Sequence, residues 1–146
     1  MMAETLGMLC DKLTIVKLKQ YHTEDTDMLK SLNAQIIQLQ TEIDEYLNDA
    51  IVGKIPLNKL TFDSNKVFKK EGNEVGDILG GFGEVFSTLA AVNCTLWHEQ
   101  EKVYDFEKIE YEQKDIVVKQ LAILNLQRNK CIDSINNQFL ELIKKN

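Results

Sequence analysis

The stretch Leu29-Lys-Ser-Leu-Asn-Ala-Gln-Ile-Ile-Gln-Leu-Gln-Thr-Glu-Ile-Asp-Glu-Tyr46 decides the fold class of this chain. Its apolar side chains recur at alternating steps of three and four residues, at Leu29, Leu32, Ile36, Leu39, Ile43 and Tyr46. This spacing is typical of a helix packed along a helical seam and not of a strand, in which apolar and polar residues alternate. We therefore expect one long helix over about residues 25–51, preceded by capping residues at 22–27.

Three further helices are predicted, over about residues 5–21, 82–106 and 112–143. Residues 52–76 are rich in glycine, asparagine and other turn residues, so we expect a long irregular connection there. The inner stripe of the last helix is predicted to contain Val117, Leu121, Leu124, Arg128, Ile132 or Cys131, Ile135, Phe139 and Leu142. The predicted fold is an all-α bundle of four main helices in one domain, residues 1–146.

Composition limits the classes of function. The chain has a formal net charge of −6 at pH 7, which disfavours duplex nucleic acid and anionic membrane surfaces as partners. No apolar run is long enough to span a membrane, and acidic Glu4 and Asp11 lie where a secretory signal would be basic or apolar. We expect a cytoplasmic protein that forms a homo-oligomer through its long apolar stripes.

Cysteine and glycine are both predicted to have structural roles. No C-x-x-C spacing occurs, so we expect reduced, buried, structural thiols at Cys10, Cys94 and Cys131. No phosphate-loop motif is present either, so close helix packing or a kink is the expected role of Gly76, Gly80, Gly81 and Gly83.

Polar side chains interrupt three of the predicted helices at spacings close to whole helical turns. They are Asp11, Lys19 and His22, then Asn93, Trp97 and Glu101, and finally Asn125, Arg128, Asn129 and Asp133. Each group falls along one edge of its helix, and packing is expected to bring the three edges together around a pocket. These ten residues are the predicted ligand-binding site.

Two interpretations of this polar set are open. In the first, Asp11, Glu101 or Asp133 neutralises Arg128 and Lys19 in a buried network that fixes helix register. In the second, Arg128, Lys19 and His22 face a phosphate or carboxylate of a small anionic ligand. Trp97 would then stack on a base or sugar of that ligand.

The sequence contains no convincing catalytic constellation. Carboxylates that could hold a metal occur as Glu42 with Glu45, but these are expected to form a solvated face. His98-Glu99 lacks the second histidine of a zinc protease, and no serine or cysteine pairs with a histidine as a nucleophile would require. We expect no metal, no cofactor and no catalytic residue.

The chain resembles a group of uncharacterised bacterial domain families, which are known only as domains of unknown function and are often encoded near glycan-biosynthesis genes. Their motifs are approximately D-[KR]-L-[ST]-I-L-x-L-K-x-x-H, N-x-x-L-W-x-x-E-D-x-x-R and N-x-x-R-N-D-x-I-[DE]. The first is matched at Asp11, Lys12, Leu13, Thr14, Ile15, Leu18, Lys19 and His22, and the third at Asn125, Arg128, Asn129, Ile132 and Asp133. The middle motif keeps Asn93, Leu96 and Trp97 but has Gln100, Glu101 and Tyr104 where the families have Glu, Asp and Arg. The resemblance implies an all-helical fold with a common polar site.

Together these patterns favour recognition over reaction. The predicted function is non-catalytic binding of a small polar or anionic, nucleotide-like molecule between helices, for example as a phage-type sponge for a signalling nucleotide. The alternatives are an enzyme of nucleotide or glycan metabolism and a purely structural helical interaction protein.

Overall fold

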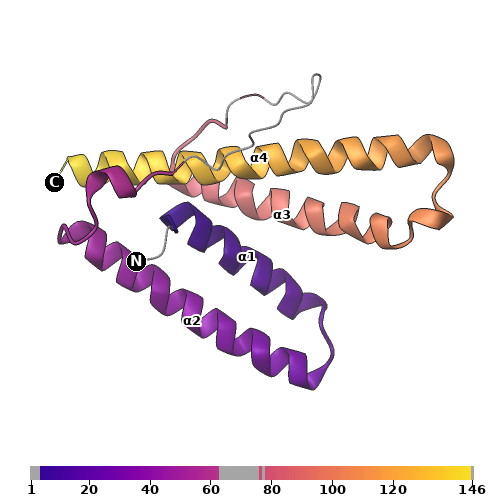
Figure 1. Ribbon diagram of the computed structural model, residues 1–146, viewed down its shortest axis with the longest axis horizontal. Helices are drawn as coiled ribbons and strands as arrows, with labels where there is room; N and C mark the ends of the chain where they lie inside the picture. Colours follow the sequence, from indigo (N-terminus) through magenta and orange to yellow (C-terminus); the bar gives the residue numbers. More distant parts are fainter. Residues whose placement is uncertain (1–3, 63–75, 77, 146) are drawn as a thin grey trace. The chain divides into compact units, whose positions relative to one another are not determined.

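The computed structural model describes residues 4–62, 76 and 78–145, and every regular element among them is helical. The elements are α1 (Leu6–His22), α2 (Thr26–Ile51), the short 3-10 helix η1 (Leu57–Lys59), α3 (Phe82–Tyr104), the 3-10 helix η2 (Phe106–Lys108) and α4 (Tyr111–Lys144), shown in Figure 1. The all-α prediction with four main helices is confirmed, as is the long connection between α2 and α3. None of the described helices is long and apolar enough to cross a membrane.

The chain divides into two compact units. Unit 1 comprises residues 1–63 and 132–146, and unit 2 comprises residues 64–131, so α4 contributes to both. Unit 1 therefore contains α1, α2, η1 and the C-terminal part of α4, whereas unit 2 contains α3, η2 and the remainder of α4. The single domain expected from chain length stays a prediction.

Side-chain caps fix where the helices of unit 1 begin. The Thr5 hydroxyl accepts a hydrogen bond from the Met8 backbone N–H at 3.3 Å, and the Asp25 carboxylate accepts from the backbone N–H groups of Asp27 and Met28 at 2.9 and 3.0 Å. Each cap satisfies N–H groups that have no partner within the helix. The capping function predicted for residues 22–27 is thereby confirmed.

The α2 seam packs against α1 as its periodicity predicts. Val16 of α1 forms a buried cluster with Leu32 and Ile36 of α2, and Leu13 and Leu39 pack against this cluster. Only residues 23–25 separate the two helices, which makes them antiparallel neighbours within unit 1 (Figure 1). Burial of these branched side chains supplies the main stabilisation of the pair.

The start of α1 lies directly against the C-terminal part of α4 in unit 1. The Gly7 backbone N–H donates a buried hydrogen bond of 2.7 Å to the side-chain oxygen of Asn136. A Cβ atom added at Gly7 would lie 2.6 Å from the backbone oxygen of Ile132. Nearby, the rings of Tyr46 and Phe139 are 6.2 Å apart. Only glycine permits the two backbones to approach this closely.

In unit 2, residues 105–110 turn the chain back from α3 into α4 (Figure 1). The Lys114 ammonium group lies 4.9 Å from the centre of the Phe106 ring at this turn, a favourable cation–π contact. The sequence predicts an apolar stripe along α3 that consists of Phe82, Val85, Leu89, Val92, Leu96, Val103 and Phe106. This α3 stripe is confirmed at Val85, Leu89 and Val92, which are all buried. The helix ends at Tyr104, two residues earlier than predicted.

Three sequence predictions are wrong in whole or in part. Close packing or a kink was expected for four glycines, but no atom lies within 4 Å of an added Cβ at Gly76, Gly81 and Gly83, so close packing does not explain them. Gly80 adopts φ +115°, a conformation that glycine tolerates and that turns the chain before α3. Cys10, Cys94 and Cys131 form no disulfide, but Cys94 is exposed and not buried. Leu142 is 54% exposed because it lies in the last turn of α4.

Candidate functional site

The three predicted site residues of α1 occupy three different environments. Asp11 is only 3% exposed, whereas Lys19 and His22 are exposed. Burial raises the pKa of the adjacent Cys10 thiol to about 11, and the charge of Asp11 adds to this effect. The His22 ring stands edge-on to the Tyr21 ring at 5.2 Å. A buried carboxylate thus precedes a solvent-accessible lysine and a solvent-accessible imidazole along this helix.

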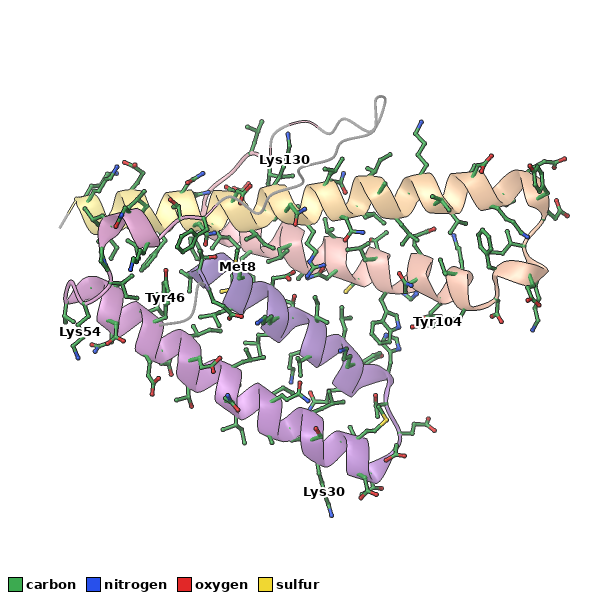
Figure 2. All side chains as sticks on the ribbon, viewed as in Figure 1. Met8, Lys30, Tyr46, Lys54, Tyr104 and Lys130 are labelled. Carbon is green, nitrogen blue, oxygen red and sulfur yellow. The ribbon has the colours of Figure 1, made fainter. Side chains whose placement is uncertain are left out.

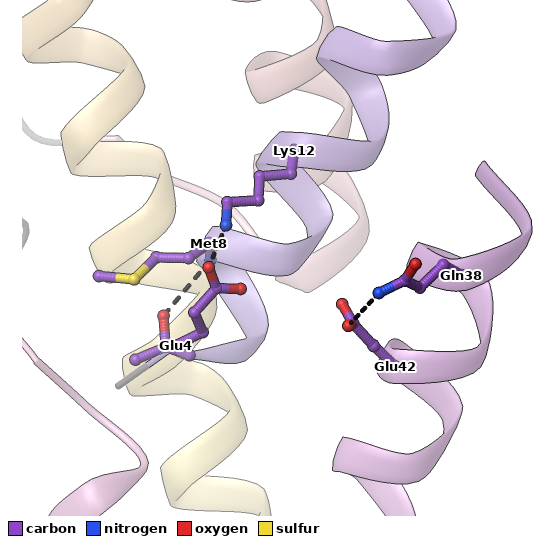
Figure 3. Close-up of polar contacts among 6 residues, drawn as sticks. Glu4, Met8, Lys12, Gln38 and Glu42 are labelled. Carbon is purple, nitrogen blue, oxygen red and sulfur yellow. Dashed lines mark hydrogen bonds and ion pairs between the residues drawn. The ribbon is translucent and has the colours of Figure 1, made fainter. Parts of the chain in front are cut away.

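Lys19 lines a pocket of about 330 Å³ between α1 and α2. Lys12 lies on the same wall, and the facing wall carries Gln35, Gln38 and Glu42. Figure 3 shows Lys12 paired with Glu4 and the Gln38 amide donating to Glu42, the latter at 3.2 Å. Because Glu4 neutralises Lys12, the charges of Lys19 and Glu42 leave the described lining of this pocket close to neutral.

The α3 residues of the predicted site differ in exposure along one face of the helix. Asn93 is 3% exposed, Trp97 one turn later is half-buried, and Glu101 is exposed. The Glu101 carboxylate lies 3.8 Å from Nδ1 of His98. The stretch therefore runs from a buried amide, through the only tryptophan of the chain, to a solvated carboxylate.

The α4 residues of the predicted site are all half-buried. The Asn125 amide donates to the backbone oxygen of Leu121 at 3.0 Å within its own helix. Arg128 and Asn129 follow within the next turn and belong to unit 2, whereas Asp133 belongs to unit 1. Unit 2 thus contains six of the ten predicted residues, and unit 1 contains Asp11, Lys19, His22 and Asp133.

Unit 1 contains a second, larger pocket of about 400 Å³, which was not predicted from the sequence. Its wall includes the α2 carboxylates Glu42, Glu45 and Asp49, of which the first two were expected only to form a solvated face. The other wall comes from the irregular segment 54–62. Figure 2 shows Tyr46 and Lys54, two of its lining residues, near the end of α2. A row of acids at whole-turn spacing was the only sequence signal for this pocket.

The Tyr46 hydroxyl in this pocket is buried and has no hydrogen-bond partner with acceptable geometry. Burial raises the pKa of Tyr46 above its usual value, and a backbone group of Leu6 opposes part of this effect. Within residues 4–62, 76 and 78–145, no cluster of three or more histidine, cysteine or acidic side chains could hold a metal ion.

No family model, curated protein or solved structure matches this chain. The resemblance to uncharacterised helical families consequently stays a prediction.

Proposed function

We propose that this protein binds a small polar or anionic molecule, with nucleotides as the first candidates, and that it does so without catalysing a reaction. The proposal rests on one observation: polar side chains lie at shielded positions on the apolar faces of the helices in unit 2. Asn93 is 3% exposed beside buried Val92, and half-buried Arg128 follows buried Leu124 by one turn.

Shielding such groups has an energetic cost. A guanidinium group removed from water destabilises the fold by several kcal/mol unless a partner and hydrogen bonds compensate for it. Arg128 is the only arginine of the chain. A guanidinium group binds phosphate or carboxylate through two parallel hydrogen bonds. An anionic ligand could therefore form two hydrogen bonds with Arg128, which an apolar side chain at this position could not provide.

The rise per residue of a helix supports similar heights for the two site amides of α3 and α4. Asn93 lies about 16 Å from the end of α3, and Asn125 lies about 21 Å from the start of α4, at a rise of about 1.5 Å per residue. Because the two helices run antiparallel, both amides fall in the same zone of unit 2. Trp97 is one turn from Asn93 and keeps part of its indole accessible, as stacking on a base requires.

The only tryptophan provides a direct assay. A nucleotide and sugar-nucleotide panel is titrated while Trp97 fluorescence is recorded, and calorimetry measures the same affinities independently. Arg128→Ala should weaken binding at least tenfold, as expected for loss of a charge-assisted bidentate contact. Lys119→Ala removes an exposed cation from the same helix and should leave binding unchanged. Equal affinities for the two variants would reject Arg128 as a ligand residue.

If the protein only sequesters a nucleotide, that nucleotide should be released chemically intact when the protein is unfolded. Mass spectrometry of the released ligand measures this. Release of a hydrolysed or transferred product would instead support the enzyme alternative, and its loss in Glu101→Gln would locate the reaction.

A further inference from the structure

The larger pocket of unit 1 is lined by other described residues than the proposed anion site. It is formed by the start of α1, the second half of α2 and the segment 54–62, so all of its walls belong to one compact unit. Its apolar surface comes from Leu9, Tyr46, Ile55 and Phe62. A volume of about 400 Å³ falls in the range of small-molecule sites.

The charged lining of this pocket is predominantly acidic. Among the described residues that line it, four carboxylates, those of Glu4, Glu42, Glu45 and Asp49, accompany two lysines, so these residues carry a formal charge of −2 at neutral pH. Lys54 neutralises Asp49 at 4.0 Å, and Lys12 pairs with Glu4. Glu45 makes no ion pair with any described residue, so its carboxylate contributes a full negative charge at the rim.

Tyr46 contributes its ring to the apolar wall of the pocket. Its oxygen has almost no solvent-accessible surface, so a ligand in the pocket would contact the ring and not the hydroxyl. The tyrosine ring itself packs 6.2 Å from the Phe139 ring, which fixes its position on the pocket wall.

We propose that this pocket binds a small organic cation, in which an ammonium group is carried on an aromatic or alkyl body. The carboxylates attract the charge, and the apolar wall, which includes the Tyr46 ring, accommodates the body. An anionic ligand would meet a net negative lining. A bare metal ion would find no cluster of three suitable ligands among the described residues.

Three probes with the same ring separate the contribution of charge from that of apolar contact. Tyramine carries an ammonium group, tyrosol a neutral hydroxyl group and 4-hydroxyphenylacetate a carboxylate. Calorimetric titration of the whole chain should give the order tyramine, then tyrosol, then 4-hydroxyphenylacetate. Absence of tyramine binding at millimolar concentration, or equal binding of all three probes, would overturn the proposal.

Variants of opposite sign locate the interaction in the pocket. Glu45→Gln should weaken tyramine binding about two- to fivefold, the range measured for partly exposed charge pairs. Asp44→Asn removes the same charge from the neighbouring position, which does not line the pocket, and should have no effect. Lys59→Gln removes a lining cation and should strengthen binding by a similar factor. Weaker binding in Lys59→Gln, or equal effects of the two α2 variants, would refute a charge-selective pocket.

The two proposals can fail separately. Arg128→Ala should leave tyramine affinity unchanged, and Glu45→Gln should leave nucleotide affinity unchanged. Loss of both activities in either variant, with the helical circular dichroism signal intact, would contradict the assignment of two distinct sites.

Discussion

Replacing Gly7 with alanine places a methyl group where α1 and α4 leave no space for one. The added Cβ would lie 2.6 Å from the Ile132 backbone oxygen, 2.8 Å from the Asn136 side-chain oxygen and 3.1 Å from Ile132 Cγ2. The nearest of these atoms is backbone, so rotation of a side chain cannot relieve the contact. Alanine therefore forces the start of α1 away from α4.

The change in the free energy of unfolding combines one stabilising and two destabilising contributions. Alanine favours a helix over glycine by up to about 1 kcal/mol. Overpacking a close contact costs about 1–3 kcal/mol. The displacement also stretches the buried hydrogen bond from the Gly7 N–H to Asn136, now 2.7 Å, and such a bond contributes about 0.5–1.5 kcal/mol. The net expectation is a loss of about 1–3 kcal/mol in the free energy of unfolding.

Urea unfolding followed by far-ultraviolet circular dichroism measures this loss, and Gly83→Ala is the matched control. Gly83 holds the same position in α3 as Gly7 holds in α1, the second residue of the helix, but no atom lies within 4 Å of its added Cβ. Gly83→Ala should raise stability by up to about 1 kcal/mol. If both variants raise stability, the close approach of α1 and α4 does not exist.

Three further predictions concern individual groups. At pH 8 and under native conditions, an alkylating reagent should modify exposed Cys94 quickly and the buried Cys10 and Cys131 slowly; rapid modification of all three would show that the thiols are accessible. Because the pKa of Cys10 is about 11 in the folded protein and 9.0 for a free thiol, the thiol ionises at lower pH in the unfolded chain. The neutral Cys10 thiol therefore contributes fully to the free energy of unfolding below pH 9, and this contribution declines as the pH rises towards 11. Urea unfolding curves that do not shift between pH 9 and 11 would contradict this prediction. Tyr46→Phe removes the hydroxyl that has no partner and should raise the free energy of unfolding by about 1 kcal/mol, whereas a loss would mean that the hydroxyl is bonded. Sedimentation equilibrium should reveal a homo-oligomer, which a monomeric mass at all concentrations would exclude.

Local periodicity was sufficient to predict the helices. The Leu29–Tyr46 seam, the Asp25 cap and the positions of all four main helices depend on residues within a few turns of one another. The role of Gly7 was not predictable in this way, because its contact partner Asn136 lies 129 positions away in the sequence. In isolation this glycine looks like a residue that only weakens a helix.

The error at Cys94 shows which kind of sequence signal is stronger. Cysteine is commonly buried, and the prediction followed that tendency. The α3 stripe already contradicted it, since a residue two positions after Val92 points about 200° away around a helix. Helical position therefore outweighs residue type when the two disagree. Asn93 follows the same rule, since it is polar but is buried four residues after Leu89 of the stripe.

The charge of the whole chain is a poor guide to what it binds. The overall value of −6 disfavours anions, yet unit 1 carries one nearly neutral pocket, in which Lys19 offsets Glu42, and a second, acidic pocket with Glu45. Glu42 lines both pockets, so they are adjacent. Screening over about 8 Å at physiological ionic strength confines each pocket largely to the influence of its own lining. Raising the salt concentration should therefore reduce the preference for tyramine over tyrosol while leaving tyrosol binding itself undiminished, because salt screens charge and does not weaken apolar contact.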